Sequence, residues 1–279
     1  MRRIDLQEWN GFGGGSSSKS YYHKTDTSLM LKMMDKSAST DMYRKEIENS
    51  EKVYNLGIPT PKPGELVTDG TCIGIIYERI VGKRSFARAI GEEPEKIPFF
   101  AAGYAEMVRS LHSTECPVTL FPDVKSLYRE LILRNPYRSA DLKSKAVAFM
   151  DSLPDATTCL HGDLHFGNII TTGRNSYFID LNNFCYGNPL FDFGMMQALV
   201  AVGPDTVERF TDEFHCTPEQ ASTFYDMSLY EYFGHDTDLE KLKSDIMPYA
   251  AVRLMTMEPE CSTQAPDNIA DEMYSIFLR

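Results

Sequence analysis

The sequence predicts an α+β fold with two lobes, a small antiparallel β-sheet with one helix followed by a mainly helical region. Three observations support this prediction. Short apolar segments broken by glycine and turn residues dominate residues 1–81, and helical periodicity dominates residues 82–279, although a β-hairpin pattern interrupts it near residue 170. A chain of 279 residues buries an ample core. We therefore expect one lobe at residues 1–81 and the other at residues 82–279.

Five strands and one helix are expected in the first lobe. Alternating apolar residues, glycines and turn signals place them as follows: strands at 4–9, 21–23, 28–34, 65–68 and 71–80, and a helix at 40–57. Beyond Gly82 the pattern becomes helical. Helices are expected at 94–112, 124–133, 140–153, 204–215, 218–233, 237–256 and 268–278, and another begins near residue 190.

Composition argues against several classes of protein. The net charge is −12 and no basic face is visible, which disfavours a nucleic-acid partner. No apolar run approaches the roughly 20 residues of a membrane helix, and the N-terminus lacks the apolar core of a signal peptide. The six cysteines are scattered without a Cys-x-x-Cys pair. We therefore expect a cytoplasmic protein without a membrane or nucleic-acid partner.

The acidic charge is concentrated near the C-terminus. Residues 199–279 contain sixteen Asp and Glu against five Lys and Arg, whereas the charges of residues 1–198 nearly cancel. Such a surface ordinarily serves solubility. The alternative is a surface that attracts a cationic substrate.

A glycine-rich run separates the first two expected strands. It includes Gly13, Gly14, Gly15 and Ser16. Glycines between antiparallel strands allow backbone N–H groups to approach phosphate oxygens without obstruction by side chains. A flexible linker is the alternative. The run has no Gly-Lys-Ser/Thr ending, which excludes a Walker-type P-loop.

The segment from Thr158 to Asp180 is the most informative part of the chain. A short apolar strand enters a polar loop at 161–168, and a hairpin follows. This arrangement brings together Asp163 in the loop, Asn168 at its exit and Asp180 at the far end of the hairpin. Two oxygen ligands suit a hard cation, and the third group can handle a hydroxyl proton. These are the minimal requirements of phosphoryl transfer from a magnesium nucleotide.

Three sequence motifs resemble the aminoglycoside phosphotransferase and choline kinase superfamily. They are His-Gly-Asp-Leu-His-x-Gly-Asn at 161–168, Ile-Asp at 179–180 and Gly-Asn-Pro-Leu-Phe-Asp-Phe-Gly at 187–194. Members of this superfamily are small-molecule kinases with a protein-kinase-like fold. The resemblance implies a kinase that uses ATP (or GTP) and Mg²⁺ to phosphorylate a hydroxyl of a small molecule. The acidic C-terminal third favours an amine-bearing, aminoglycoside- or choline-like acceptor, while sugars, amino acids and protein hydroxyls stay open.

The resemblance assigns roles around the central motif. Asp163 is the expected catalytic carboxylate, and Asn168 and Asp180 are the expected metal ligands. His161 and Asp192 are expected to support the loop through hydrogen bonds to its backbone. Asp192 begins a triplet spelled like the metal-binding Asp-Phe-Gly of protein kinases, but it stands at a helix start. The metal is therefore assigned to Asp180, which ends a hairpin strand.

The resemblance also implies how the first lobe binds a nucleotide. Lys32 is a lone cation in an apolar strand, where an unpaired buried ammonium is costly, although an edge lysine can point to water. A kinase fold needs such a lysine on the phosphates, paired with a helix glutamate. Glu46 is the expected partner, with Glu48 and Glu51 as competitors.

The end of the fifth strand resembles the hinge of the family. Backbone groups around Arg79 and Ile80 are expected to hold the adenine edge, with Tyr77 at the back of the pocket. An ordinary core position for Tyr77 is compatible with this role.

Two other functions compete with the kinase. His161, Asp163 and His165 could form a zinc site, but the other histidines are not in motif spacing. A catalytically inert kinase-fold protein would have lost its base, a metal ligand or its lysine, and all of these are present. The sequence departs from many relatives in two places. Phe166 replaces a proline, and Asn182-Asn183 replaces acidic residues, so a second metal would be held less tightly.

Overall fold

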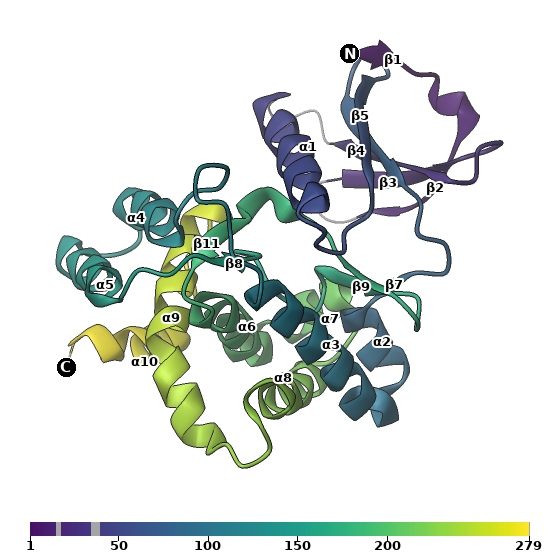
Figure 1. The fold of residues 1–279 in the computed structure, drawn as a ribbon. Coiled ribbons are helices and arrows are strands. Elements are labelled where there is room, and N and C mark those ends of the chain that lie inside the picture. Colours follow the sequence, from purple (N-terminus) through teal and green to yellow (C-terminus); the bar gives the residue numbers. More distant parts are fainter. Residues whose placement is uncertain (15–17, 35–39, 279) are drawn as a thin grey trace. The chain divides into compact units, whose positions relative to one another are not determined.

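The computed structural model describes residues 1–14, 18–34 and 40–278. The chain divides into two compact units (Figure 1). The first comprises Met1–Ser85 and Ile169–Asn182, and the second comprises Phe86–Asn168 and Asn183–Arg279. Within the described residues, no helix combines the length and apolar character needed to cross a membrane.

A six-stranded sheet forms most of the first unit, with strand order β1-β5-β6-β4-β3-β2. All neighbours pair antiparallel except β1 and β5, which are parallel. The bounds are β1 Arg2–Arg3, β2 Trp9–Gly14, β3 Ser18–His23, β4 Leu29–Met34, β5 Pro63–Thr68 and β6 Ile73–Glu78. One helix, α1 (Thr40–Asn55), belongs to the same unit.

The strand expected at residues 4–9 is wrong. Leu6–Glu8 forms a 3₁₀ turn instead, because the side chain of Asp5 accepts a hydrogen bond from the Gln7 N–H and caps it. The strand begins at Trp9 and extends to Gly14, so it includes the start of the glycine run.

The two faces of this sheet pack differently because neighbouring strand residues point to opposite sides. Leu31, Met33 and Ile76 belong to a core cluster on one face. Ile75 and Tyr77 belong to a second cluster, with Ile47 from α1. Lys32 lies between Leu31 and Met33, so this alternation directs it toward the face covered by α1.

A small three-stranded sheet completes the first unit. Its order is β10-β9-β7, with bounds β7 Arg84–Ser85, β9 Ile169–Thr171 and β10 Ser176–Phe178. Strands β9 and β10 form the predicted hairpin, in which Ile169 pairs with Phe178 at the open end. Gly173 occupies the turn with a φ of 82°, a left-handed conformation that glycine adopts without strain.

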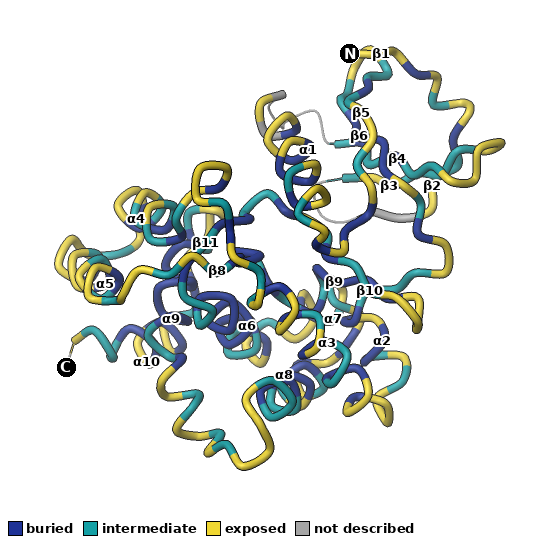
Figure 2. Tube along the Cα trace, viewed as in Figure 1, coloured by how far each residue is buried: buried dark blue, intermediate teal, exposed yellow. Residues whose placement is uncertain are grey.

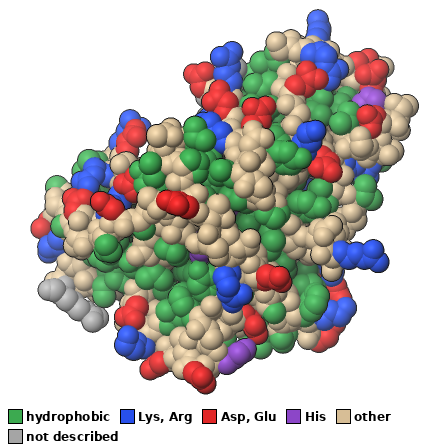
Figure 3. Space-filling model, viewed as in Figure 1, with side chains coloured by type: hydrophobic (Ala, Val, Ile, Leu, Met, Phe, Trp, Pro, Cys, Tyr) green, Lys and Arg blue, Asp and Glu red, His purple; other side chains and the backbone are tan. Residues whose placement is uncertain are grey.

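The second unit is mainly helical, as predicted. Its helices are α2 Phe86–Glu92, α3 Ile97–His112, α4 Val124–Arg134, α5 Ala140–Ser152, α6 Leu190–Val202, α7 Val207–Phe214, α8 Pro218–Phe233, α9 Leu239–Glu260 and α10 Asp267–Leu278. Strands β8 (Thr158–Leu160) and β11 (Cys185–Gly187) pair antiparallel. The segment of α6 from Phe191 to Leu199 is buried throughout (Figure 2), and α9 packs beside it in the main core. Acidic and basic side chains are interspersed on the face drawn in Figure 3.

Candidate active site

Lys32 is the centre of the polar group in the first unit. Its Nζ donates to Glu46 Oε1 at 2.8 Å and to Asp180 Oδ1 at 2.5 Å. Strand alternation brings Lys32 toward α1, and the β9–β10 hairpin carries Asp180. Burial alone would lower the pKa of Lys32, but the carboxylates of Asp180 and Glu46 raise it above its usual value. Lys32 is therefore held as a cation.

Glu46 is the partner of Lys32 among the three candidate glutamates of α1. Its side chain is buried, whereas Glu48 and Glu51 are exposed. The Tyr77 hydroxyl donates to Glu46 Oε1 at 3.0 Å, and Asn182 Nδ2 donates to Oε2 at 3.3 Å. Both carboxylate oxygens of Glu46 are thus engaged, which satisfies a charge that would otherwise be costly to bury.

Asp180 has an unusual backbone conformation. Its φ is 58°, in the left-handed region that Asp and Asn tolerate better than most residues. The next turn of the chain is anchored by Asn49, whose Nδ2 donates to the carbonyls of Leu181 and Asn182 at 3.3 Å each. Helix α1 therefore supports both the Lys32 partner and the turn that carries Asp180.

The glycine run is only partly described. Gly13 and Gly14 pair with Ser20 and Lys19 as part of the β2–β3 ladder. Gly15 and Ser16 lie outside the described residues.

The expected hinge follows β6. The Arg79 N–H donates to Ser28 O at 2.7 Å, which engages this N–H within the sheet. The Arg79 guanidinium lies over the Tyr22 ring, 4.3 Å from its centroid. Ile80 is buried beside this position.

A second polar group lies in the second unit, in the loop that follows β8. Asp192 accepts hydrogen bonds from the backbone N–H of His161 and of Gly162, each at 2.9 Å. His112 Nε2 lies 3.1 Å from the same carboxylate. Gly162 has a φ of 78°, and a Cβ there would lie 2.0 Å from the Asn183 carbonyl oxygen. Only glycine therefore fits the sharp turn before Asp163.

Asp163 is held through both of its carboxylate oxygens. Arg253 Nη2 donates to Oδ1 at 3.0 Å, and Asn168 Nδ2 donates to Oδ2 at 3.2 Å and to the Asp163 carbonyl at 2.9 Å. Its side chain is 26% exposed, so it is accessible to a ligand. Burial alone would raise the pKa of Asp163, but the charges of Arg253 and His165 lower it below its usual value.

Sequence reasoning missed Arg253, which lies on α9 ninety positions after Asp163. Its guanidinium is buried and also donates to Thr256 Oγ1 at 2.7 Å and to Glu260 Oε2 at 2.6 Å. No motif marks this residue. The sequence feature that could have indicated it is a single charged residue within the apolar stretch Ala250–Met255. Lys32 stands in a similar apolar context in its strand.

The histidines of the loop make local backbone contacts. His161 Nδ1 accepts from the Asp163 N–H at 3.3 Å, and His165 Nδ1 accepts from the Gly167 N–H at 3.0 Å. In the described part of the chain, no three His, Cys, Asp or Glu side chains gather as a set that could hold a metal ion. The Nδ1 atoms of both imidazoles are thus engaged by backbone N–H groups of the loop.

Phe166 packs within the protein at a position where the resemblance to the superfamily leads us to expect proline. It is fully buried, and its ring centroid lies 5.1 Å from that of Phe214 and 6.1 Å from that of Phe224. Its carbonyl accepts from the Ala87 N–H at 2.9 Å. Aromatic packing and this hydrogen bond fix the loop where proline would restrict φ.

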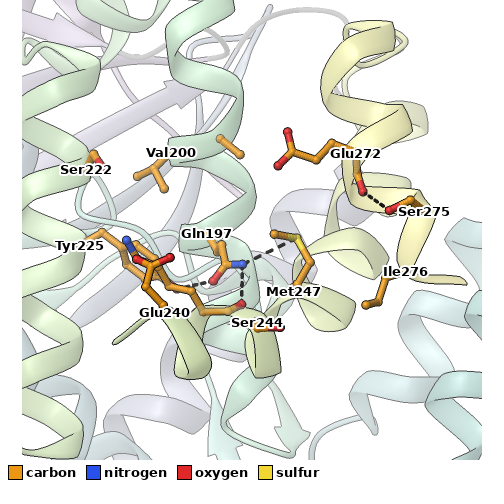
Figure 4. A pocket seen from close by; sticks show the side chains of 12 residues that line it. Gln197, Val200, Ser222, Tyr225, Glu240, Ser244, Met247, Glu272, Ser275 and Ile276 are labelled. Atoms are coloured by element: carbon orange, nitrogen blue, oxygen red, sulfur yellow. Dashed lines mark hydrogen bonds between the residues drawn. The ribbon is translucent and has the colours of Figure 1, made fainter. Parts of the chain in front are cut away.

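A pocket of about 500 Å³ opens among α6, α8, α9 and α10 (Figure 4). Gln197 is one of the residues that line it; its Nε2 donates to the Lys243 carbonyl at 3.0 Å and its Oε1 accepts from Tyr225 at 3.1 Å. The residues that line this pocket include none of the predicted site residues. It is therefore distinct from the groups around Lys32 and Asp163.

An antiparallel sheet with one helix, followed by a mainly helical unit, is a protein-kinase-like fold. The APH model, described as the phosphotransferase enzyme family, matches residues 8–223, so the chain belongs to this family. No curated protein sequence matches the chain.

Similar solved structures include three kinases. A choline/ethanolamine kinase family protein from Mesorhizobium loti has a TM-score of 0.57 at 15% identity. The match covers 96% of this chain and 86% of the Mesorhizobium loti chain. ADP-bound aminoglycoside phosphotransferase APH(2'')-Ib has a TM-score of 0.59 at 14% identity, with coverages of 98% and 92%. Amicoumacin kinase hAmiN, in complex with AMP-PNP, Ca²⁺ and Ami, has a TM-score of 0.58 at 14% identity, with coverages of 99% and 90%. The predicted superfamily and fold class are confirmed.

Proposed function

We propose that this protein transfers the γ-phosphate of ATP to a hydroxyl group of a small molecule. The observation that carries the proposal is the contact of Lys32 with both Glu46 and Asp180. A lysine oriented by a helix glutamate is the arrangement that kinase folds use to hold nucleotide phosphates. The nucleotides named for two of the similar structures, ADP and AMP-PNP, also support ATP as the donor.

Lys32, held by Glu46, orients the phosphates of the nucleotide. Backbone N–H groups of the loop that includes Gly13, Gly14, Gly15 and Ser16 cover these phosphates. The backbone around Arg79 and Ile80 holds the adenine edge, through groups other than the Arg79 N–H that bonds to Ser28. Tyr77 closes the back of the adenine pocket, where burial and Glu46 raise the pKa of its hydroxyl and keep it neutral.

Asp163 accepts the proton of the attacking hydroxyl or orients that hydroxyl in line with the γ-phosphate. His161 and Asp192 support the loop, because Asp192 fixes two of its backbone N–H groups. The transition state of phosphoryl transfer is loose, so positioning and charge neutralisation contribute more than deprotonation. A lowered pKa suits this role, since Asp163 stays ionised and accepts a hydrogen bond from the hydroxyl.

Asn168 and Asp180 are the proposed ligands of Mg²⁺. Asn168 directly precedes β9 and Asp180 follows β10 by two residues, so both adjoin the open end of one hairpin. The side-chain nitrogen of Asn168 donates to Asp163. The side-chain oxygen of Asn168 is therefore the atom that would coordinate a hard cation. Amide and carboxylate oxygens fit Mg²⁺, which when bound neutralises charge on the nucleotide phosphates.

The proposed acceptor is an amine-bearing alcohol. The acidic excess of residues 199–279 supports it, because such a surface attracts cations. Two of the similar structures are named as an aminoglycoside phosphotransferase and a choline/ethanolamine kinase family protein. Sugars, amino acids and protein hydroxyls are the competing acceptors.

A screen of hydroxyl acceptors by ATP consumption tests the function. We expect Mg-dependent transfer of phosphate to at least one cationic alcohol and slow ATP hydrolysis without an acceptor. A response to neutral sugars alone would overturn the cationic acceptor but keep the kinase. Absence of both hydrolysis and transfer, with ATP still bound, would identify an inert nucleotide-binding protein instead.

Glu46→Gln is expected to raise the KM for ATP and to lower stability. The neutral amide no longer holds Lys32, which keeps only Asp180 as a charged partner. Because that partner remains, the loss of stability should be smaller than the roughly 3–5 kcal/mol that follows the breaking of an isolated buried pair. Glu48→Gln on the exposed face of α1 is the matched control. Equal KM values for the two variants would contradict the role of Glu46.

A further inference from the structure

We propose that Arg253 is a positioning residue that fixes the carboxylate of Asp163 for phosphoryl transfer. This inference rests on the proposed function and extends it to a residue on α9, outside the sequence motifs. Arg253 touches Asp163 and acts through it.

The guanidinium of Arg253 is tightly constrained. Its side chain is 3% exposed, and it bonds through Nη2 to Asp163 and through Nη1 to Thr256 and Glu260. Its Nε lies 3.1 Å from Met195 Sδ. A planar guanidinium can direct donors to several partners at once, whereas a lysine ammonium provides one point charge. A guanidinium with a partner at each of its three nitrogens has little freedom to move.

This constraint passes directly to Asp163. Arg253 holds Oδ1 and Asn168 holds Oδ2, so rotation of the carboxylate would break both hydrogen bonds. A carboxylate that is preorganised in this way avoids the decrease in kcat that small displacements of a catalytic group cause. Without Arg253, one oxygen would lose its partner and the carboxylate could turn away from the attacking hydroxyl.

The charges around Asp163 are consistent with this role. Arg253 is the cation that bonds to it, and His161 and His165 are the other groups whose charge acts on it. Glu260, on the last turn of α9, pairs with Arg253 through Nη1 at 2.6 Å. Arg253 therefore bridges two carboxylates, which stabilises a cation that would be costly to bury alone.

Arg138 provides a matched control. It is also a largely buried arginine of the second unit, and it pairs with Glu258 on α9. Its guanidinium lies over the Tyr274 ring at 4.9 Å, as that of Arg253 lies over the Tyr128 ring at 5.7 Å. Among the described residues, the hydrogen-bonding partner of the Arg138 guanidinium is Glu258 and not Asp163, so Arg138 reproduces the structural role of a buried pair with α9 without the proposed positioning role.

The experiment is a double-mutant cycle, with product followed by radiolabelled phosphate. Arg253→Met is expected to lower kcat by about 10–100-fold, the usual effect of losing a group that orients a site residue. The KM for ATP should stay unchanged. In an Asp163→Asn background the same change should cause no further loss, because the carboxylate that Arg253 positions is gone. Arg138→Met should lower the melting temperature and keep kcat.

Equal losses of kcat in the two backgrounds would overturn the proposal, since Arg253 would then act only through the fold. Wild-type turnover by Arg253→Met would also overturn it.

If that variant does not fold, Arg253→Lys replaces it in the same double-mutant cycle and the same comparison of kcat applies. If the turnover of Asp163→Asn is too slow to measure, rescue by added guanidinium ion replaces the cycle. Guanidinium should raise the kcat of Arg253→Ala and leave the kcat of Arg138→Ala unchanged. Failure to raise the kcat of Arg253→Ala would overturn the proposal. Absence of transfer by the wild-type protein would instead refute the proposed function.

Discussion

Replacing Asp163 by asparagine is expected to lower kcat on the order of 10³-fold, within the range that general acid–base groups contribute. The change removes the carboxylate that accepts the hydrogen bond of the attacking hydroxyl. It keeps the shape of the side chain and an oxygen that can face Arg253 or Asn168. Because the proposed phosphate contacts come from Lys32 and its partners, the KM for ATP should change little.

Steady-state kinetics with an identified acceptor measure this effect, and thermal unfolding checks that the variant folds. Asp151→Asn is the control, since Asp151 is an exposed acid of the same unit that pairs with Arg129 on the surface. It should keep full activity. Unchanged turnover by Asp163→Asn would remove Asp163 from the mechanism and leave the proposed reaction without its catalytic carboxylate.

The kinase-like fold could be predicted from the sequence because its local signals agree. The hairpin forms as predicted, and alternation along β4 directs Lys32 away from the Leu31 and Met33 face. The resemblance favoured Glu46 over Glu48 and Glu51 as the partner of Lys32, and the packing of α1 buries Glu46 while it leaves the other two exposed. Local pattern therefore predicts an element, while tertiary packing selects the residue within it.

The sequence could not predict contacts that depend on distant packing. Arg253 meets Asp163 because α9 packs beside α6 in the core, and nothing in the local pattern of α9 encodes that position. Phe166 is a similar case. Phe214 and Phe224 pack against it, and neither residue is near it in the sequence. The 3₁₀ turn at Leu6–Glu8 was missed for a local reason, because the Asp5 cap outweighed the apolar alternation.

Asp180→Asn is expected to lower kcat by about 10²–10³-fold, the range found when one electrostatic contact to the transition state is lost. The backbone at this position has a φ of 58°, and asparagine tolerates the left-handed region as well as aspartate does. The substitution therefore removes charge with little backbone strain. Lys32 keeps Glu46 as a partner at 2.8 Å, so the first unit should stay folded.

A measurement that does not depend on turnover separates metal binding from other roles of Asp180. A ligand at 100 times its Kd stabilises the folded state by about 2.7 kcal/mol, so Mg-ATP should raise the melting temperature of the wild-type protein. In Asp180→Asn the further increase due to Mg²⁺ over ATP with EDTA should disappear. Glu65→Gln, which changes an exposed acid of the same unit paired with Arg2, should keep it.

A normal Mg²⁺ response and normal turnover in Asp180→Asn would place the metal elsewhere. Asp192 would be a poor substitute despite the Asp-Phe-Gly triplet. Its Oδ1 accepts from Gly162, and its Oδ2 accepts from His161 and lies 3.1 Å from His112. A metal ligand at Asp192 would have to give up these hydrogen bonds and release the backbone that presents Asp163. The two carboxylates therefore cannot exchange roles without loss of the catalytic loop.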